Sequence, residues 1–119
     1  MLPERHLSGQ WLDQGTGIKD AKLSGVHLRL PGYSKDGPTL EIFTCFDNQP
    51  KLNSSANFEG YGHIAFEVDD VFLVTEMVLK QGGRKVGEVS SSKVEGVGVI
   101  TFVYLIDPEG NIIELQSLK

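Results

Sequence analysis

The sequence predicts an α+β domain, and two observations support that prediction. Residues 62–119 read in the order strand, helix, strand, strand, strand, because alternating apolar positions give way once to helical spacing and then return. A hairpin pattern also occurs twice, each time with a proline leading the turn and a glutamate midway along the return strand. Those glutamates are Glu41 and Glu114, and an internal repeat of this kind makes their positions equivalent.

The composition limits the classes of function. A chain of 119 residues with 39% apolar residues is long enough for one domain with a hydrophobic core. The net charge of −5 argues against nucleic acid or an anionic membrane as the main partner. The longest mostly apolar stretch, residues 97–106, is too short to cross a bilayer. Cys45 is the only cysteine, which excludes an internal disulfide and favours a cytoplasmic compartment.

The first half of the chain predicts one hairpin. Residues 1–20 are polar, and only an irregular segment or a short helix near Trp11 is expected there. Apolar and polar residues alternate over residues 21–30, which predicts a strand, and residues 39–45 predict its return strand after a turn rich in glycine and proline. Residues 47–61 contain many helix- and strand-breaking residues and are interpreted as a linker.

The second half predicts one helix and four strands. Asp69 or Asp70 is expected to cap the helix, because a carboxylate accepts the free backbone N–H groups of a first turn, and Gly82-Gly83 is expected to end it. The core-facing stripe of this helix is predicted to be Val71, Val74, Thr75 and Val78. The strands are expected at residues 62–68, 85–89, 100–106 and 112–118.

Three polar residues in these strands are candidates for chemistry. Glu41, His63 and Glu114 each lie between apolar residues, and a strand side chain points away from its immediate neighbours. Two carboxylates and an imidazole that converge on one sheet face can bind a divalent metal. The alternative for each residue taken singly is a solvated glutamate or a half-buried histidine. Candidate residues for a substrate cleft are Phe43, Phe102 and Tyr104.

Two phrases in the sequence carry a family resemblance. The run GHIAFEVDDV at residues 62–71 and the run DPEGNIIEL at residues 107–115 resemble the opening and the close of a module of the vicinal oxygen chelate superfamily. That superfamily includes glyoxalase I, methylmalonyl-CoA epimerase, extradiol dioxygenases, and fosfomycin and bleomycin resistance proteins. The resemblance covers residues 21–119.

The resemblance implies a fold and a set of ligands. Members pair two β-α-β-β-β modules into a curled mixed sheet around a metal. Residues 62–119 are then the complete second module, and residues 21–46 are a remnant of a first module that lacks its first strand and helix. Glu41, His63 and Glu114 would be the metal ligands. The fourth position of the family has no counterpart, although His6 or His27 could fill it, and His27 is interpreted as an ordinary strand-surface histidine.

The resemblance also implies an activity. A lactoylglutathione lyase-like or epimerase-like enzyme would act on a small carbonyl or thioester compound, with Ni, Co, Mn, Zn or Mg stabilising an enediolate. Glu114 or Glu41 would act as the base. A homodimer or higher homo-oligomer is expected to cover exposed sheet edges. Two alternatives stay open: a metal-free small-molecule binder of the antibiotic type, and an inactive truncated relative that forms an oligomer.

Overall fold

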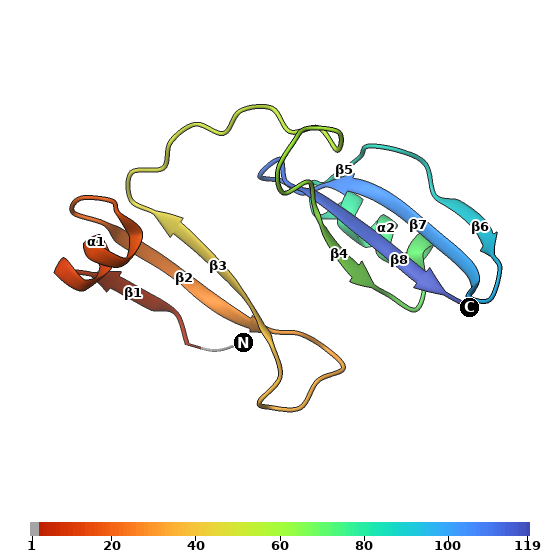
Figure 1. Ribbon diagram of the computed structural model, residues 1–119, viewed down its shortest axis with the longest axis horizontal. Coiled ribbons are helices and arrows are strands. Elements are labelled where there is room, and N and C mark those ends of the chain that lie inside the picture. The colour runs from red at the N-terminus through yellow and green to blue at the C-terminus, as the bar shows by residue number, and fades with distance from the viewer. Residues whose placement is uncertain (1–2) are drawn as a thin grey trace. The chain divides into compact units, whose positions relative to one another are not determined.

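The computed structural model describes residues 3–119, which form two helices and eight strands in an α+β arrangement (Figure 1). The chain divides into two compact units, a first unit that ends at Lys51 and a second unit from Leu52 to Lys119. No helix within residues 3–119 has the length and apolar character needed to cross a membrane.

The first unit is a three-stranded antiparallel sheet in the order β1-β2-β3. Its strands are β1 (Arg5–Ser8), β2 (Lys22–Arg29) and β3 (Thr39–Cys45), and the short helix α1 (Gln10–Thr16) connects β1 to β2. The predicted hairpin and the short helix are therefore present. Strand β1 was not expected, because it contains one apolar residue, Leu7, and owes its conformation to pairing with β2.

The second unit is built on a mixed sheet in the order β4-β8-β7-β5, with β6 also pairing with β7. Strand β4 runs parallel to β8, and the other pairs are antiparallel. Figure 1 shows β8 between β4 and β7. The strands are β4 (Ile64–Glu67), β5 (Arg84–Lys85), β6 (Ser90–Val94), β7 (Gly98–Ile106) and β8 (Ile112–Leu118).

The prediction of a single strand over residues 85–89 is wrong in its bounds. Two short strands, β5 and β6, pair with the same edge of β7, and the chain between them leaves the ladder. The backbone N–H groups of Val86 and Gly87 both donate to the carbonyl of Tyr104, at 3.0 and 3.3 Å. Two residues opposite one is the pattern of a β-bulge. Val89 follows the bulge and packs against the core.

Helix α2 (Val71–Lys80) begins at the predicted cap and covers one face of this sheet. The Asp70 carboxylate accepts a hydrogen bond from the Leu73 N–H at 2.9 Å. The predicted stripe faces inward, since Val71 and Thr75 are buried and the other two members are partly buried against the core. The core of the second unit consists of Val71, Val103, Leu105 and Leu115.

Replacing the capping residue should weaken the second unit. We expect Asp70→Ala to lower the free energy of unfolding by about 0.5–2 kcal/mol, because the Leu73 N–H loses its acceptor. Urea denaturation followed by circular dichroism measures this change. Asp69→Ala removes the same charge one residue earlier and is the matched control. Equal effects of the two substitutions would show that the charge, and not the cap, matters.

Candidate functional site

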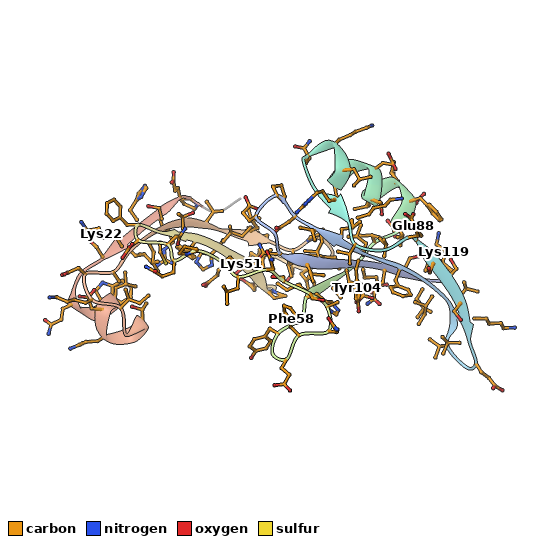
Figure 2. The ribbon with its side chains drawn as sticks, turned by 90° about the horizontal axis from the view of Figure 1, so that it is seen from above. Lys22, Lys51, Phe58, Glu88, Tyr104 and Lys119 are labelled. Carbon is orange, nitrogen blue, oxygen red and sulfur yellow. The ribbon has the colours of Figure 1, made fainter. Side chains whose placement is uncertain are left out.

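The face of the second sheet opposite α2 carries the candidate site. Val103, Leu105 and Leu115 point into the core beneath α2. Side chains alternate along a strand, so Tyr104 and Glu114 point to the other face, where the antiparallel register of β7 and β8 makes them direct partners. Figure 2 shows α2 on one side of these strands and Tyr104 on the other.

His63 and Glu114 meet on this face. The distance from His63 Nε2 to Glu114 Oε2 is 2.9 Å, and the two side chains are 27% and 15% exposed. His63 immediately precedes β4, whose parallel pairing with β8 sets Ala65 beside Glu114. The parallel pairing of β4 with β8 thus brings together two residues that lie far apart in the sequence. His63 and Glu114 lie side by side, as their strand positions predict.

Aromatic rings flank the His63–Glu114 pair. The Tyr104 ring lies 4.6 Å from the His63 ring between centroids, with a 42° angle between the planes. The Phe102 ring meets Tyr104 edge-on at 5.9 Å. Of the three predicted cleft residues, Tyr104 therefore contacts His63 directly, and Phe102 contacts Tyr104.

Glu41 lies in the first unit, opposite His27 in the register of β2 and β3. His27 Nδ1 lies 3.4 Å from Glu41 Oε1. The Phe43 ring, the third predicted cleft residue, meets the His27 ring edge-on at 5.8 Å. The His27 side chain is 16% exposed, so His27 is a half-buried strand histidine, and whether it has a role beyond the sheet surface stays a prediction. The pairing register of the predicted hairpin is the sequence feature that places His27 opposite Glu41.

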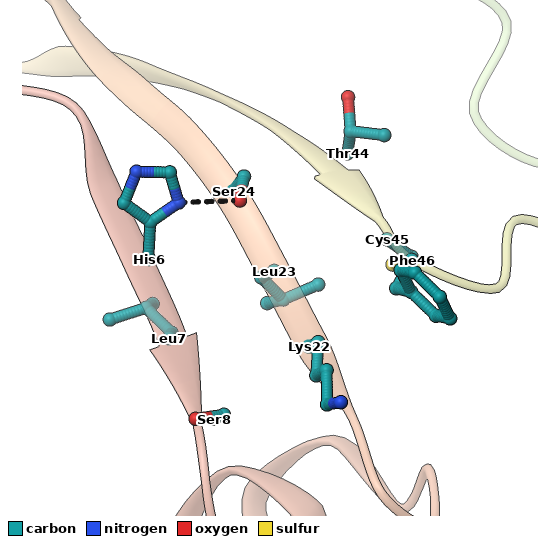
Figure 3. Close-up of a pocket in the computed structure, with 9 residues that line it drawn as sticks. All are labelled: His6, Leu7, Ser8, Lys22, Leu23, Ser24, Thr44, Cys45 and Phe46. Carbon is teal, nitrogen blue, oxygen red and sulfur yellow. Dashed lines mark hydrogen bonds between the residues drawn. The ribbon is translucent and has the colours of Figure 1, made fainter.

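His6 does not share a face with Glu41. It pairs with Ser24 across β1 and β2, and its Nδ1 makes a 2.8 Å hydrogen bond with the Ser24 hydroxyl (Figure 3). Ser24 and His27 are three residues apart on one strand and therefore point to opposite faces. His6 thus does not fill the fourth ligand position beside Glu41.

The donor atoms present suit a divalent metal in kind. The His27–Glu41 pair of the first unit and the His63–Glu114 pair of the second each bring an imidazole nitrogen to a carboxylate oxygen, a combination that binds Zn, Ni, Co or Mn. Within either unit, over residues 3–119, no group of three or more His, Cys, Asp or Glu side chains is arranged to hold an ion. His63 and Glu114 therefore fit as part of a metal shell that needs at least one further ligand.

Each unit also has a hollow of its own. The larger, of about 390 Å³, opens on the first unit between β1, β2 and the end of β3, and half-buried Cys45 contributes to it (Figure 3). The smaller, of about 280 Å³, lies beside α2, where a hydrogen bond to Glu88 raises the pKa of Lys85 above its usual range. Neither hollow is lined by Glu41, His63 or Glu114.

Comparison with known proteins identifies relatives of this chain, although no family model matches it. The lactoylglutathione lyase of Neisseria meningitidis is 50% identical over 103 residues, which cover 85% of this chain and 70% of that enzyme. A probable lactoylglutathione lyase of Synechocystis is 32% identical over 97 residues, covering 82% and 70% of the two chains. This chain belongs to the glyoxalase family.

A solved structure supports the glyoxalase fold. The crystal structure of a glyoxalase family protein from Bacillus cereus matches 98% of this chain and 75% of its own length, with a TM-score of 0.76 and 21% identity. The resemblance to the vicinal oxygen chelate superfamily and the predicted α+β fold are therefore confirmed. The metal, the ligand set and the cleft residues stay predictions.

Proposed function

We propose that this glyoxalase family member is a metal-dependent isomerase or lyase that acts on a small thioester or carbonyl compound. The observation that carries the proposal is the His63–Glu114 pair, 2.9 Å apart on the sheet face opposite α2, in a chain 50% identical to a lactoylglutathione lyase. The thioester in that relative's name, lactoylglutathione, is the first substrate to test.

The ligands proposed are His63, Glu114 and Glu41, with Ni, Co, Mn, Zn or Mg as the ion. His63 Nε2 and Glu114 Oε2 are donors of the types that such ions bind. A bound divalent ion would supply Lewis-acid polarisation of the substrate carbonyl. In this proposal His63 is held in place by the Tyr104 ring, so that little side-chain freedom is lost on binding.

Glu114 is the proposed base. Its carboxylate is 15% exposed. Proton transfer from the sulfur-bearing carbon, which becomes the thioester carbonyl, to the carbon beside it needs a group that first accepts a proton and then returns it. Glu41, which is 62% exposed, is the second candidate for this role. Phe43, Phe102 and Tyr104 are proposed to line the substrate site and to exclude water from it.

The proposal includes an assembly and a compartment. In the first unit, β1 and β3 are the edge strands of the sheet, and pairing with a second copy would cover these edges. We therefore propose a homodimer or higher homo-oligomer. A cytoplasmic location accords with a single free cysteine.

A metal-free small-molecule binder is the second candidate function. The observation that favours it is the row of rings formed by Phe102, Tyr104 and His63, which offers aromatic contacts to a small ligand. Such a binder would hold its ligand equally well before and after treatment with a chelator. An enzyme of the kind proposed would lose activity on chelation and regain it when the ion is restored.

The ligand set is tested by ion binding. We expect the purified chain to bind one Co²⁺, Ni²⁺ or Zn²⁺ ion in calorimetric titration, and His63→Ala with Glu114→Ala to weaken that binding at least about a hundredfold. His6→Ala with Glu109→Ala removes the same residue types elsewhere and should leave the affinity unchanged. A wild-type chain that binds no ion, or a double variant that binds as tightly, would rule out this metal site.

A further inference from the structure

We infer that His27 is a positioning residue for Glu41. The Nδ1 side of its ring contacts the Glu41 carboxylate, and Arg5 orients the ring by donating to Nε2. The inference rests on the proposed function, in which the Glu41 carboxylate is a metal ligand. His27 is not one of the proposed ligands. The inference explains how the first unit could fix the position of Glu41, whose side chain is 62% exposed.

The first step is the placement of His27. Its register partner is Glu41, and the adjacent strands put both side chains on the same face. The His27 ring is covered by its neighbours and meets the Phe43 ring edge-on, whereas the Glu41 side chain lies mostly in solvent. The imidazole is thus the fixed member of the pair, and the carboxylate is the member whose rotamers need restriction.

The second step is the proton on the imidazole. Arg5 Nη1 lies 3.1 Å from His27 Nε2. A guanidinium group has donors and no acceptor, so Nε2 must accept this hydrogen bond with its lone pair. The hydrogen of the neutral ring then lies on Nδ1, which faces Glu41 Oε1 and the Thr39 hydroxyl, each at 3.4 Å.

The third step separates positioning from ligation. A nitrogen that carries a hydrogen has no lone pair in the ring plane for a metal, and Nε2 already faces a cation. His27 is therefore not the missing fourth ligand. Its Nδ1 instead lies 3.4 Å from the Glu41 carboxylate. Groups that contact a metal ligand from behind orient it, and their loss typically weakens metal affinity about 10–100-fold.

The test compares two substitutions of His27 in the full chain, with Co²⁺ as the probe. We expect His27→Leu to weaken Co²⁺ binding about tenfold, because the Glu41 carboxylate loses the imidazole that contacts it. His27→Asn should restore most of that affinity, since its amide can carry an N–H near the position of Nδ1. The visible absorption of bound Co²⁺ should change in the leucine variant and return towards that of the wild type in the asparagine variant.

Substitution of Arg5 is an independent test, because a purely electrostatic role and an orienting role predict opposite changes in Co²⁺ affinity. Removal of a positive charge near a cation site should strengthen Co²⁺ binding by electrostatics alone. We expect Arg5→Leu to weaken it several-fold instead, because Nε2 is released and Nδ1 no longer has to carry the hydrogen. Arg29→Leu removes the same charge from β2 and is the control.

The outcomes distinguish this inference from the proposed function. Failure of the wild-type chain to bind Co²⁺ would overturn both. Weak binding by His63→Ala together with unchanged binding by His27→Leu would overturn the role of His27 alone. Tighter binding by Arg5→Leu, or no recovery in His27→Asn, would do the same.

Discussion

Glu114→Gln is expected to lower kcat by about a hundredfold to ten-thousandfold, the range typical for loss of a general base. Glutamine has nearly the same shape as glutamate, but its amide cannot accept a proton from a carbon acid. The His63 imidazole keeps a neutral acceptor at 2.9 Å, so the sheet should stay folded. The measurement is the change in thioester absorbance with lactoylglutathione or its carbonyl isomer, at saturating substrate and saturating metal.

Two controls accompany this substitution. Glu109→Gln makes the same change in the turn before β8 and should leave kcat unchanged. Glu41→Gln tests the second candidate base under the same conditions. An unchanged kcat in Glu114→Gln, with a large loss in Glu41→Gln, would move the base to the first unit and leave Glu114 with a ligand role only.

Leu105→Ala is expected to have the largest effect on stability, a loss of about 2–5 kcal/mol in the free energy of unfolding. Leu105 is fully buried, at 0% exposure, between β7 and α2, where it packs with Val71 and Leu115. Truncation removes apolar burial and leaves a cavity that a sheet paired on both sides of β7 cannot easily close.

Denaturation in urea checks the expected loss. Leu73→Ala, at an α2 position that is 61% exposed, removes the same atoms without opening a cavity and should change stability by less than about 0.5 kcal/mol. A loss below about 1 kcal/mol in Leu105→Ala would mean that the second unit repacks around the gap. The core in the structure would then not be the one that determines stability.

The exact first and last residues of two strands could be predicted from the sequence, because apolar and polar residues alternate there and a clear turn precedes each strand. The expected ranges 39–45 and 112–118 coincide with β3 and β8. In both cases a proline-containing turn precedes the strand, and apolar side chains alternate with polar ones along it. Helix α2 was predictable for the same kind of reason, since its cap and its stripe are local features.

Elements that depend on a distant partner could not be predicted. Strand β1 has four residues and one apolar side chain, and only the hydrogen bonds to β2 make it a strand. The break between β5 and β6 depends on the carbonyl of Tyr104, which lies 17 residues beyond Gly87 in the chain. The conformational preferences of the residues themselves predict neither strand β1 nor this break.

The candidate site divides in the same way. His63 and Glu114 were predictable as a pair, because strand parity set both apart from the apolar side chains around them. The contacts of His27 could not be predicted from the residue and its immediate neighbours in the sequence. Its significance comes from its cross-strand neighbour Glu41 and from Arg5 on the next strand, and those contacts depend on register.

The bulge opposite Tyr104 has a consequence for insertions and deletions. Five residue steps separate Lys85 from Ser90, while three separate their partners Leu105 and Phe102, so the bulged side has two residues more. An even surplus leaves the alternation of faces in phase, and β6 presents the same side chains outward as an unbroken strand would. Gain or loss of two residues here is therefore compatible with the fold. Gain or loss of one would turn β6 over, placing Ser91 and Lys93 on the face that holds Phe102.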